Sequence, residues 1–144
     1  MRGPIVRPIV IAAGGTGGHF FPAEALAAAL IARGERVALM TDSRAAARLP
    51  SSFREREVYV LQGAGIAGHG LRRQGMALAG LGIGVMQARA AFARLNAAAI
   101  VGFGGYPVVA PVLGSRLLRN RPPVILHDQN AVLGTANQIG RAHV

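Results

Sequence analysis

Short, almost uniformly apolar runs alternate along this chain with longer segments whose apolar residues recur at helical spacing. The short runs predict buried strands over residues 7–13, 36–41, 58–62, 98–103 and 124–127. The longer segments predict helices over residues 22–33, 72–95 and 107–118 and from residue 133 onward, with a short helix or turn over 43–49. Because strands that are apolar throughout alternate with helices, the pattern predicts an α/β fold, a Rossmann-like, doubly wound parallel sheet covered on both faces.

Two glycine-rich segments follow the first and fourth predicted strands. Gly15-Thr16-Gly17-Gly18-His19 and Gly102-Phe103-Gly104-Gly105-Tyr106 both read G-x-G-G followed by a ring that can hydrogen-bond. Glycine lets the backbone turn tightly and brings bare N–H groups close to a ligand, and a following helix N-terminus adds unpaired donors and a positive dipole end. Ligands of such sheets bind outside the carboxyl ends of the strands, where strand order reverses. We therefore expect both loops to open on one edge and to bind more than one phosphate, or a phosphate and a polar head group.

Polar side chains also follow the fifth predicted strand, in His127-Asp128-Gln129-Asn130. Such a run suits hydrogen bonds to sugar hydroxyls or amides, which we favour over a turn with a helix cap supplied by Asn130. His19 has two open interpretations, a general base or a residue that only donates to a phosphate or to local backbone. Tyr106 is interpreted as a binding group, because phenols ordinarily titrate far from neutral pH.

Composition narrows the classes of partner. The 144 residues are 51% hydrophobic, which indicates a globular domain rather than a disordered chain. The net charge of +10 comes with 16 basic residues, all arginine, and favours nucleic acid, acidic lipid head groups or phosphorylated metabolites. The chain has no cysteine, which excludes disulfides and thiolate metal sites, and it shows no metal-binding D-x-D pair. No secretion signal is convincing, and the longest apolar stretch, 76–86, is about half of a bilayer span.

Two further interpretations stay open on the residues alone. A dinucleotide site of an oxidoreductase would use Asp42 to bind the ribose, but the G-x-G-x-x-G spacing places bulky Phe20 where glycine or alanine is needed. A non-enzymatic basic module would bind anionic membranes or nucleic acid through its net positive charge. Separately, the stretch 66–95, in which apolar residues are bordered by arginines, could dock on an anionic membrane. The purely structural interpretation of that stretch is a helix that covers the sheet and has a solvated basic end.

Together, the glycine loops and the His127-Asp128-Gln129-Asn130 segment closely resemble the N-terminal half of the MurG family, in order and spacing over essentially the whole chain. These bacterial glycosyltransferases make the last cytoplasmic precursor of peptidoglycan. The resemblance implies a two-domain GT-B fold of which residues 1–144 are the first, acceptor-binding domain. It implies transfer of N-acetylglucosamine from UDP-N-acetylglucosamine to lipid I, with inversion, to give lipid II.

The resemblance also implies roles for particular residues. His19 is the candidate catalytic residue, and the substrate-binding candidates are Gly15, Thr16, Gly17, Gly18, His19, Gly104, Gly105, Tyr106, His127, Asp128, Gln129, Asn130 and Asn137. The family usually has glutamate where Asp128 stands, and its second loop often continues differently after the position of Tyr106. No cofactor, metal or nucleic acid is expected. The donor would bind mainly to a missing C-terminal domain, so that the chain alone would be inactive, and the protein would sit peripherally on the cytoplasmic face of the inner membrane.

Overall fold

The computed structural model describes residues 6–15, 17–63 and 70–127 of the chain. A five-stranded sheet forms its centre, in the order β3-β2-β1-β4-β5, and every neighbouring pair of strands is parallel. The strands are β1 (Ile9–Ala12), β2 (Val37–Thr41), β3 (Glu57–Val60), β4 (Ala99–Gly102) and β5 (Val124–Leu126). The helices are α1 (Gly17–Ala32), α2 (Ser43–Ala46), α3 (Leu71–Leu95) and α4 (Val109–Arg116), with 3-10 turns η1 (Ser51–Phe53) and η2 (Tyr106–Val108). The predicted Rossmann-like α/β fold is therefore confirmed.

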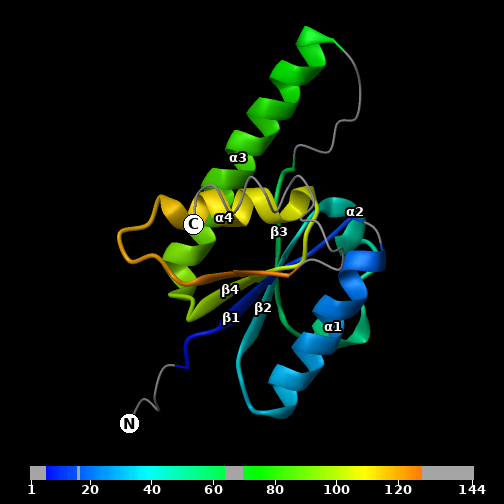
Figure 1. Ribbon diagram of the computed structural model, residues 1–144, viewed down its shortest axis with the longest axis vertical. Coiled ribbons are helices and arrows are strands. Elements are labelled where there is room, and N and C mark those ends of the chain that lie inside the picture. Colours follow the sequence, from blue (N-terminus) through cyan, green and yellow to red (C-terminus); the bar gives the residue numbers. More distant parts are fainter. Residues whose placement is uncertain (1–5, 16, 64–69, 128–144) are drawn as a thin grey trace.

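Helices cover both faces of the sheet (Figure 1). On one face, Ala23 and Ala27 of α1 pack with Leu39 and Val101 of the strands and with Phe53 of η1. On the other face, side chains of α3 and α4 pack on the alternate residues of the same strands, in a cluster that includes Val10, Ala38, Met40, Ile100, Ala88, Phe92 and Ala110. The three inner strands are thus apolar on both sides, as the uniformly apolar runs predict.

The first helix begins earlier than its sequence suggests. Proline favours the first position of a helix, so the pattern placed the start at Pro22, but α1 begins at Gly17 and Pro22 lies inside it. Consequently Gly17, Gly18 and His19 form the first turn of the helix rather than part of the preceding loop. The candidate ligand-binding residues are therefore joined directly to the positive end of α1.

The longest helix, α3, extends well beyond the sheet at its N-terminal end (Figure 1). Its last turns are buried, including Phe92 and Leu95, whereas Leu71 and Leu78 in its first turns are 89% and 69% exposed. By length and composition alone α3 is long and apolar enough to cross a bilayer. The core helix of a soluble protein passes the same test, so this finding is only weak evidence against the expectation, from the 76–86 stretch, that no helix spans a membrane.

Close backbone packing fixes α3 against its neighbours. A Cβ on Gly114 of α4 would lie 2.8 Å from the Cβ of Ala88, and one on Gly84 would lie 1.9 Å from the carbonyl oxygen of Gln62. Neither glycine can be replaced without a shift of the backbone nearby. Close packing at these two glycines therefore fixes the position of α3 beside the end of β3.

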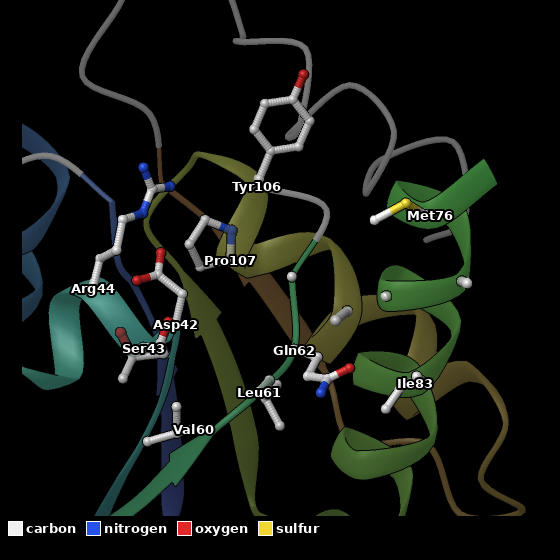
Figure 2. A pocket seen from close by; sticks show the side chains of 15 residues that line it. Asp42, Ser43, Arg44, Val60, Leu61, Gln62, Met76, Ile83, Tyr106 and Pro107 are labelled. Carbon is white, nitrogen blue, oxygen red and sulfur yellow. The ribbon is translucent and has the colours of Figure 1, made fainter. Parts of the chain in front are cut away.

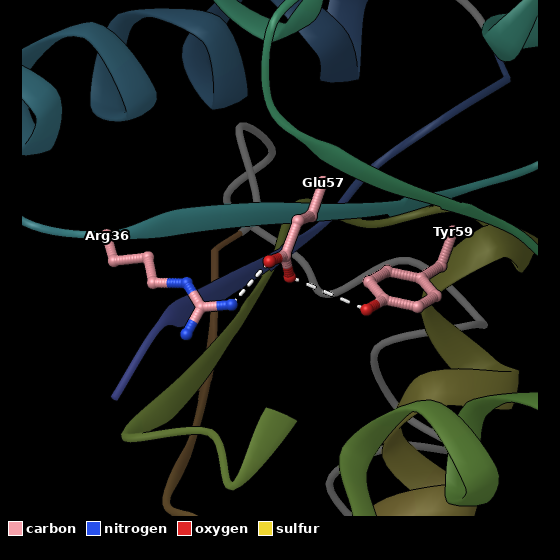
Figure 3. Close-up of polar contacts among 3 residues, drawn as sticks. All are labelled: Arg36, Glu57 and Tyr59. Carbon is pink, nitrogen blue, oxygen red and sulfur yellow. Dashed lines mark hydrogen bonds and ion pairs between the residues drawn. The ribbon is translucent and has the colours of Figure 1, made fainter. Parts of the chain in front are cut away.

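The outer strand β3 carries a small polar cluster (Figure 3). Arg36 forms an ion pair with Glu57, and the hydroxyl of Tyr59 donates to the other carboxylate oxygen of Glu57 over 3.5 Å. Partial burial raises the pKa of Tyr59 above its usual value, and the charge of Glu57 raises it further. Because Arg36 and Glu57 are exposed, their pair contributes little to stability.

Candidate functional site at the strand ends

The two glycine loops leave the sheet side by side. β1 pairs with β4 in a register that places Ala12 opposite Gly102, so the loops after these strands start at the same level. Gly15 in the first loop, and Gly104 and Gly105 in the second, all have φ between +71° and +77°. Only glycine adopts this conformation readily, so these three glycines are needed for the path of the backbone.

Direct contacts join the loops. A Cβ on Gly14 would lie 2.9 Å from Cγ of Pro107, and one on Gly105 would lie 3.9 Å from Cδ2 of His19. The ring of His19, from the first motif, therefore stands next to the backbone of the second. This arrangement confirms the expectation that the loops share one edge of the sheet at the switch point.

Three backbone donors of these loops have no acceptor among the described residues. Within the described ranges, the N–H groups of Gly15, Gly104 and Gly105 donate no hydrogen bond. The N-terminus of α1 adds the positive end of a helix dipole, and its first turn contains no acidic residue that would neutralise it. The loop region is accordingly electropositive and offers several N–H groups to an anion.

The two rings of the motifs differ in their surroundings. His19 is half-buried and forms no hydrogen bond to any other residue that the structure describes. Tyr106 is 61% exposed, and its ring points away from the strands at the rim of the site (Figure 2). His19 thus stands against the second loop, whereas Tyr106 stands at the rim of the site.

The third motif starts next to the second loop. The N–H of His127 donates to the carbonyl oxygen of Gly102 over 2.8 Å, and its ring lies 5.1 Å from that of Phe103 at 37°. Thr16, Asp128, Gln129, Asn130 and Asn137 lie outside the described residues, so their expected contacts stay predictions.

The residues proposed for a dinucleotide site have structural roles. The Asp42 carboxylate accepts a hydrogen bond of 2.9 Å from the N–H of Ala45 and thereby caps α2. Phe20 packs edge-on against Phe53, with 6.0 Å between the ring centroids, and helps to close the core below α1. These contacts favour a cap and a core residue over ribose and pyrophosphate recognition.

A hollow of about 720 Å³ opens beside the loops, and we call it the strand-end hollow (Figure 2). Its lining comes from the segments after β2 and β3, from α3 and from η2 with α4: Thr41, Asp42, Ser43, Arg44, Val60, Leu61, Gln62, Gly63, Met76, Ala79, Gly80, Ile83, Tyr106, Pro107 and Ala110. A second hollow, of about 600 Å³ and here called the loop hollow, lies between the N-terminus of α1 and α2, and Gly15, Phe21 and Arg44 line it.

Arg44 lines both hollows, and reasoning from the sequence missed it. Its guanidinium forms no ion pair or hydrogen bond with another residue of the described part of the chain. The available signal was its position, two residues after Asp42 at the carboxyl end of a central strand.

Comparison with known proteins agrees with this geometry. Residues 9–143 match the glycosyltransferase family 28 N-terminal domain. A UDP-N-acetylglucosamine–N-acetylmuramyl-(pentapeptide) pyrophosphoryl-undecaprenol N-acetylglucosamine transferase from Granulibacter bethesdensis is 59% identical over 133 residues, which are 92% of this chain and 35% of the relative. The enzyme of the same name from Acidiphilium cryptum is 55% identical over 138 residues, which are 96% of this chain and 38% of that protein.

Solved structures give the same result. The crystal structure of Acinetobacter baumannii MurG superimposes with a TM-score of 0.73 at 33% identity, over 93% of this chain and 38% of that one. CalG4, the calicheamicin glycosyltransferase, has a TM-score of 0.61 at 17% identity and shares the fold. The chain spans about a third of the length of the curated relatives that it matches. The matched region, residues 9–143, includes the whole sheet and both glycine loops. This chain therefore belongs to the glycosyltransferase family 28 N-terminal domain family.

Proposed function

We propose that this chain is the acceptor-binding part of an inverting hexosyltransferase that makes lipid II. The reaction transfers N-acetylglucosamine from UDP-N-acetylglucosamine to the C4 hydroxyl of the N-acetylmuramoyl sugar of lipid I. The names and the 59% and 55% identities of the bacterial relatives support this assignment. Because the chain spans about a third of those relatives, a second domain would supply most of the donor site.

The observation that carries the proposal is the pair of contacting glycine loops with unused backbone donors. Gly15, Gly104 and Gly105 have free N–H groups within the described ranges, and the ring of His19, in the first turn of α1, lies next to Gly105. Lipid I contains a diphosphate that joins its sugar to a polyprenyl chain, and two adjoining anion sites suit two linked phosphates. The acceptor sugar would then extend toward His127 and the polar residues that follow it.

His19 is the candidate general base of this reaction. It would take the proton of the acceptor C4 hydroxyl, whose oxygen attacks the anomeric carbon of the donor sugar while the bond to UDP breaks. One displacement inverts the configuration and leaves UDP with the electron pair of the broken bond. The half-buried position of His19, with no competing hydrogen bond to a described residue, supports this role.

The exposed part of α3 is the candidate membrane contact. Leu71, Met76, Leu78, Ile83 and Met86 are each at least 49% exposed, and Arg72 and Arg73 follow the start of the helix. An apolar surface bordered by arginines binds anionic lipid head groups while its apolar side chains enter the interface. The protein would thus act as a peripheral protein at the cytoplasmic face of the bacterial inner membrane, where its lipid-linked acceptor is embedded.

A chimera tests the proposal. This chain replaces the matching 133 residues of the Granulibacter bethesdensis relative, and conversion of lipid I into lipid II is measured with UDP-N-acetylglucosamine. We expect turnover by the chimera, none by the 144-residue chain alone, and a loss of about 10²–10⁴-fold in kcat for His19→Ala. A fully active His19→Ala chimera would remove the base assignment, and an inactive but folded chimera would contradict the proposed function.

A further inference from the structure

The strand-end hollow has two chemically different walls (Figure 2). Asp42, Ser43 and Arg44 form one side, and Met76 and Ile83 of α3 form the side that faces them. Val60 and Leu61 add apolar surface at the end of β3. The Asp42 carboxylate already caps α2, so the unpaired charge of this wall is the Arg44 guanidinium. A hollow with one cationic group on one wall and an apolar wall opposite fits a molecule that is itself part anion and part hydrocarbon.

The polar wall adjoins the glycine loops. Tyr106, which ends the second loop, and Pro107, which follows it, also line the hollow, and Pro107 lies against Gly14 of the first loop. Arg44 lines the strand-end hollow and also the loop hollow, and its cation has no partner within the described ranges. A negative group bound at the loops would therefore also be attracted to Arg44.

The base of the hollow contains an unused polar atom. Thr41 is 1% exposed, lines the hollow, and its Oγ1 has no hydrogen-bond partner among the described residues. A buried hydroxyl without a partner is unfavourable, and such atoms mark places where a ligand or water completes the site. Since Thr41 also lies against Gly14, this atom marks the end of the hollow nearest to the loops.

The apolar wall leads away from the loops and joins the exposed surface of α3. Met76 and Ile83 line the hollow and are 53% and 49% exposed, on the same helix as Leu78 and Met86. Hydrocarbon that enters at the loop end can therefore continue along α3 toward the surface proposed to contact the membrane.

From these observations we infer that the strand-end hollow binds the first isoprene units of a polyprenyl diphosphate whose diphosphate lies at the glycine loops. The inference rests on the proposed function and adds a second binding element to it. Recognition would then extend past the phosphates and the sugar to the hydrocarbon next to them. Arg44 and the glycine loops bind the diphosphate, and α3 covers the isoprenoid hydrocarbon.

A soluble binding assay tests the inference without membranes. The affinities of the 144-residue chain for inorganic pyrophosphate and for farnesyl diphosphate, below its micelle concentration, are compared by calorimetry. We expect farnesyl diphosphate to bind at least about tenfold more tightly, because burial of a few methylene groups contributes that much. Ala79→Phe fills the hollow and should abolish this advantage while the affinity for pyrophosphate stays unchanged.

Ala90→Phe is the matched control, since Ala90 is an exposed residue of α3 that does not line the hollow. Ile83→Ser provides a second variant, because Ile83 is already half-exposed and its replacement leaves the core intact. Equal affinities for the two ligands, or equal losses in Ala79→Phe and Ala90→Phe, would overturn the inference and leave the proposed function standing. Absence of pyrophosphate binding in the unmodified chain would instead contradict the role of the glycine loops, and the inference with it.

Discussion

Gly14 packs against Pro107 so closely that a single Cβ on Gly14 would lie 2.9 Å from Cγ of the proline ring. The two residues are far apart in sequence and belong to the loops after β1 and β4. The same Cβ would lie 3.0 Å from Oγ1 of Thr41, at the end of β2. The contact therefore joins three strand ends at the point where the proposed anion site and the strand-end hollow meet.

Gly14→Ala should weaken both the fold and the site. The added methyl group must push Pro107 or Thr41 aside, and overpacking of this kind costs about 1–3 kcal/mol of the free energy of unfolding. Because the displaced proline directly follows the second loop, its movement should shift that loop and lower the affinity for pyrophosphate as well. Urea unfolding and calorimetry measure the two effects. Gly18→Ala is the control for stability, since a Cβ there meets nothing within 4 Å, and an equal loss of stability in both variants would contradict this account.

Asp42 should behave as a helix cap and not as a ribose ligand. Asp42→Ala removes the acceptor for the N–H of Ala45 and should lower the free energy of unfolding by about 1 kcal/mol. Asp42→Asn keeps an acceptor oxygen and should retain most of the stability. Titration with NADH should show no binding in any of the three proteins. Binding of NADH that is lost in Asp42→Ala would revive the dinucleotide interpretation.

Charge introduced on the exposed side of α3 should release the protein from membranes. Leu78→Glu places a carboxylate where a 69% exposed leucine is proposed to enter the lipid interface. We expect binding to anionic vesicles to weaken at least about tenfold, and to weaken further with salt. Leu117→Glu, at a 53% exposed leucine outside α3, is the matched control in a vesicle co-sedimentation assay. Similar losses of vesicle binding in the two variants would show that the membrane contact is not made specifically by α3.

Alkaline pH should destabilise the outer edge of the sheet through Tyr59. Its pKa is raised by burial first and by Glu57 second, so the folded state favours the neutral phenol. Stability is then fully present below pH 10, the unfolded pKa of tyrosine, and decreases as the pH rises through the higher folded value. Tyr59→Phe should flatten this decrease in thermal unfolding profiles. The chain suits the measurement because it has two tyrosines and no lysine. An unchanged slope in Tyr59→Phe would show that the decrease has another origin.

The strands and their arrangement could be predicted from the sequence because each inner strand is apolar on both faces. Runs such as Ile9–Ala12 and Val37–Thr41 are typical of a sheet with two covered faces when they alternate with helical segments, and glycine loops after β1 and β4 fit its switch point. The start of α1 could not be predicted in this way. Glycine has low helix propensity and proline favours a first position, but Gly17 and Pro22 both lie inside the helix, whose apolar side packs on the sheet.

Of the site, the two loops were visible in the sequence and the strand-end hollow was not. The loops carry a local signal, because the positive φ angles of Gly15, Gly104 and Gly105 require glycine. Arg44 and Thr41 carry only the weak signal of their position, since an arginine and a threonine near a strand end are common on any surface. They become candidates only when the tertiary fold brings α3 opposite them and leaves the Thr41 hydroxyl without a partner.

The central claim is that the two glycine loops together bind linked phosphates through their backbone N–H groups. The most direct measurement is a titration of the isotopically labelled chain with inorganic pyrophosphate, followed by the amide signals in nitrogen–proton correlation spectra. We predict that the signals of Gly15, Gly18, Gly104 and Gly105 shift along one saturable curve, and that Gly18→Val, whose side chain enters open space at the start of α1, removes the response without unfolding the protein. Shifts spread over surface arginines with these glycines unaffected, or a full response in Gly18→Val, would contradict the claim.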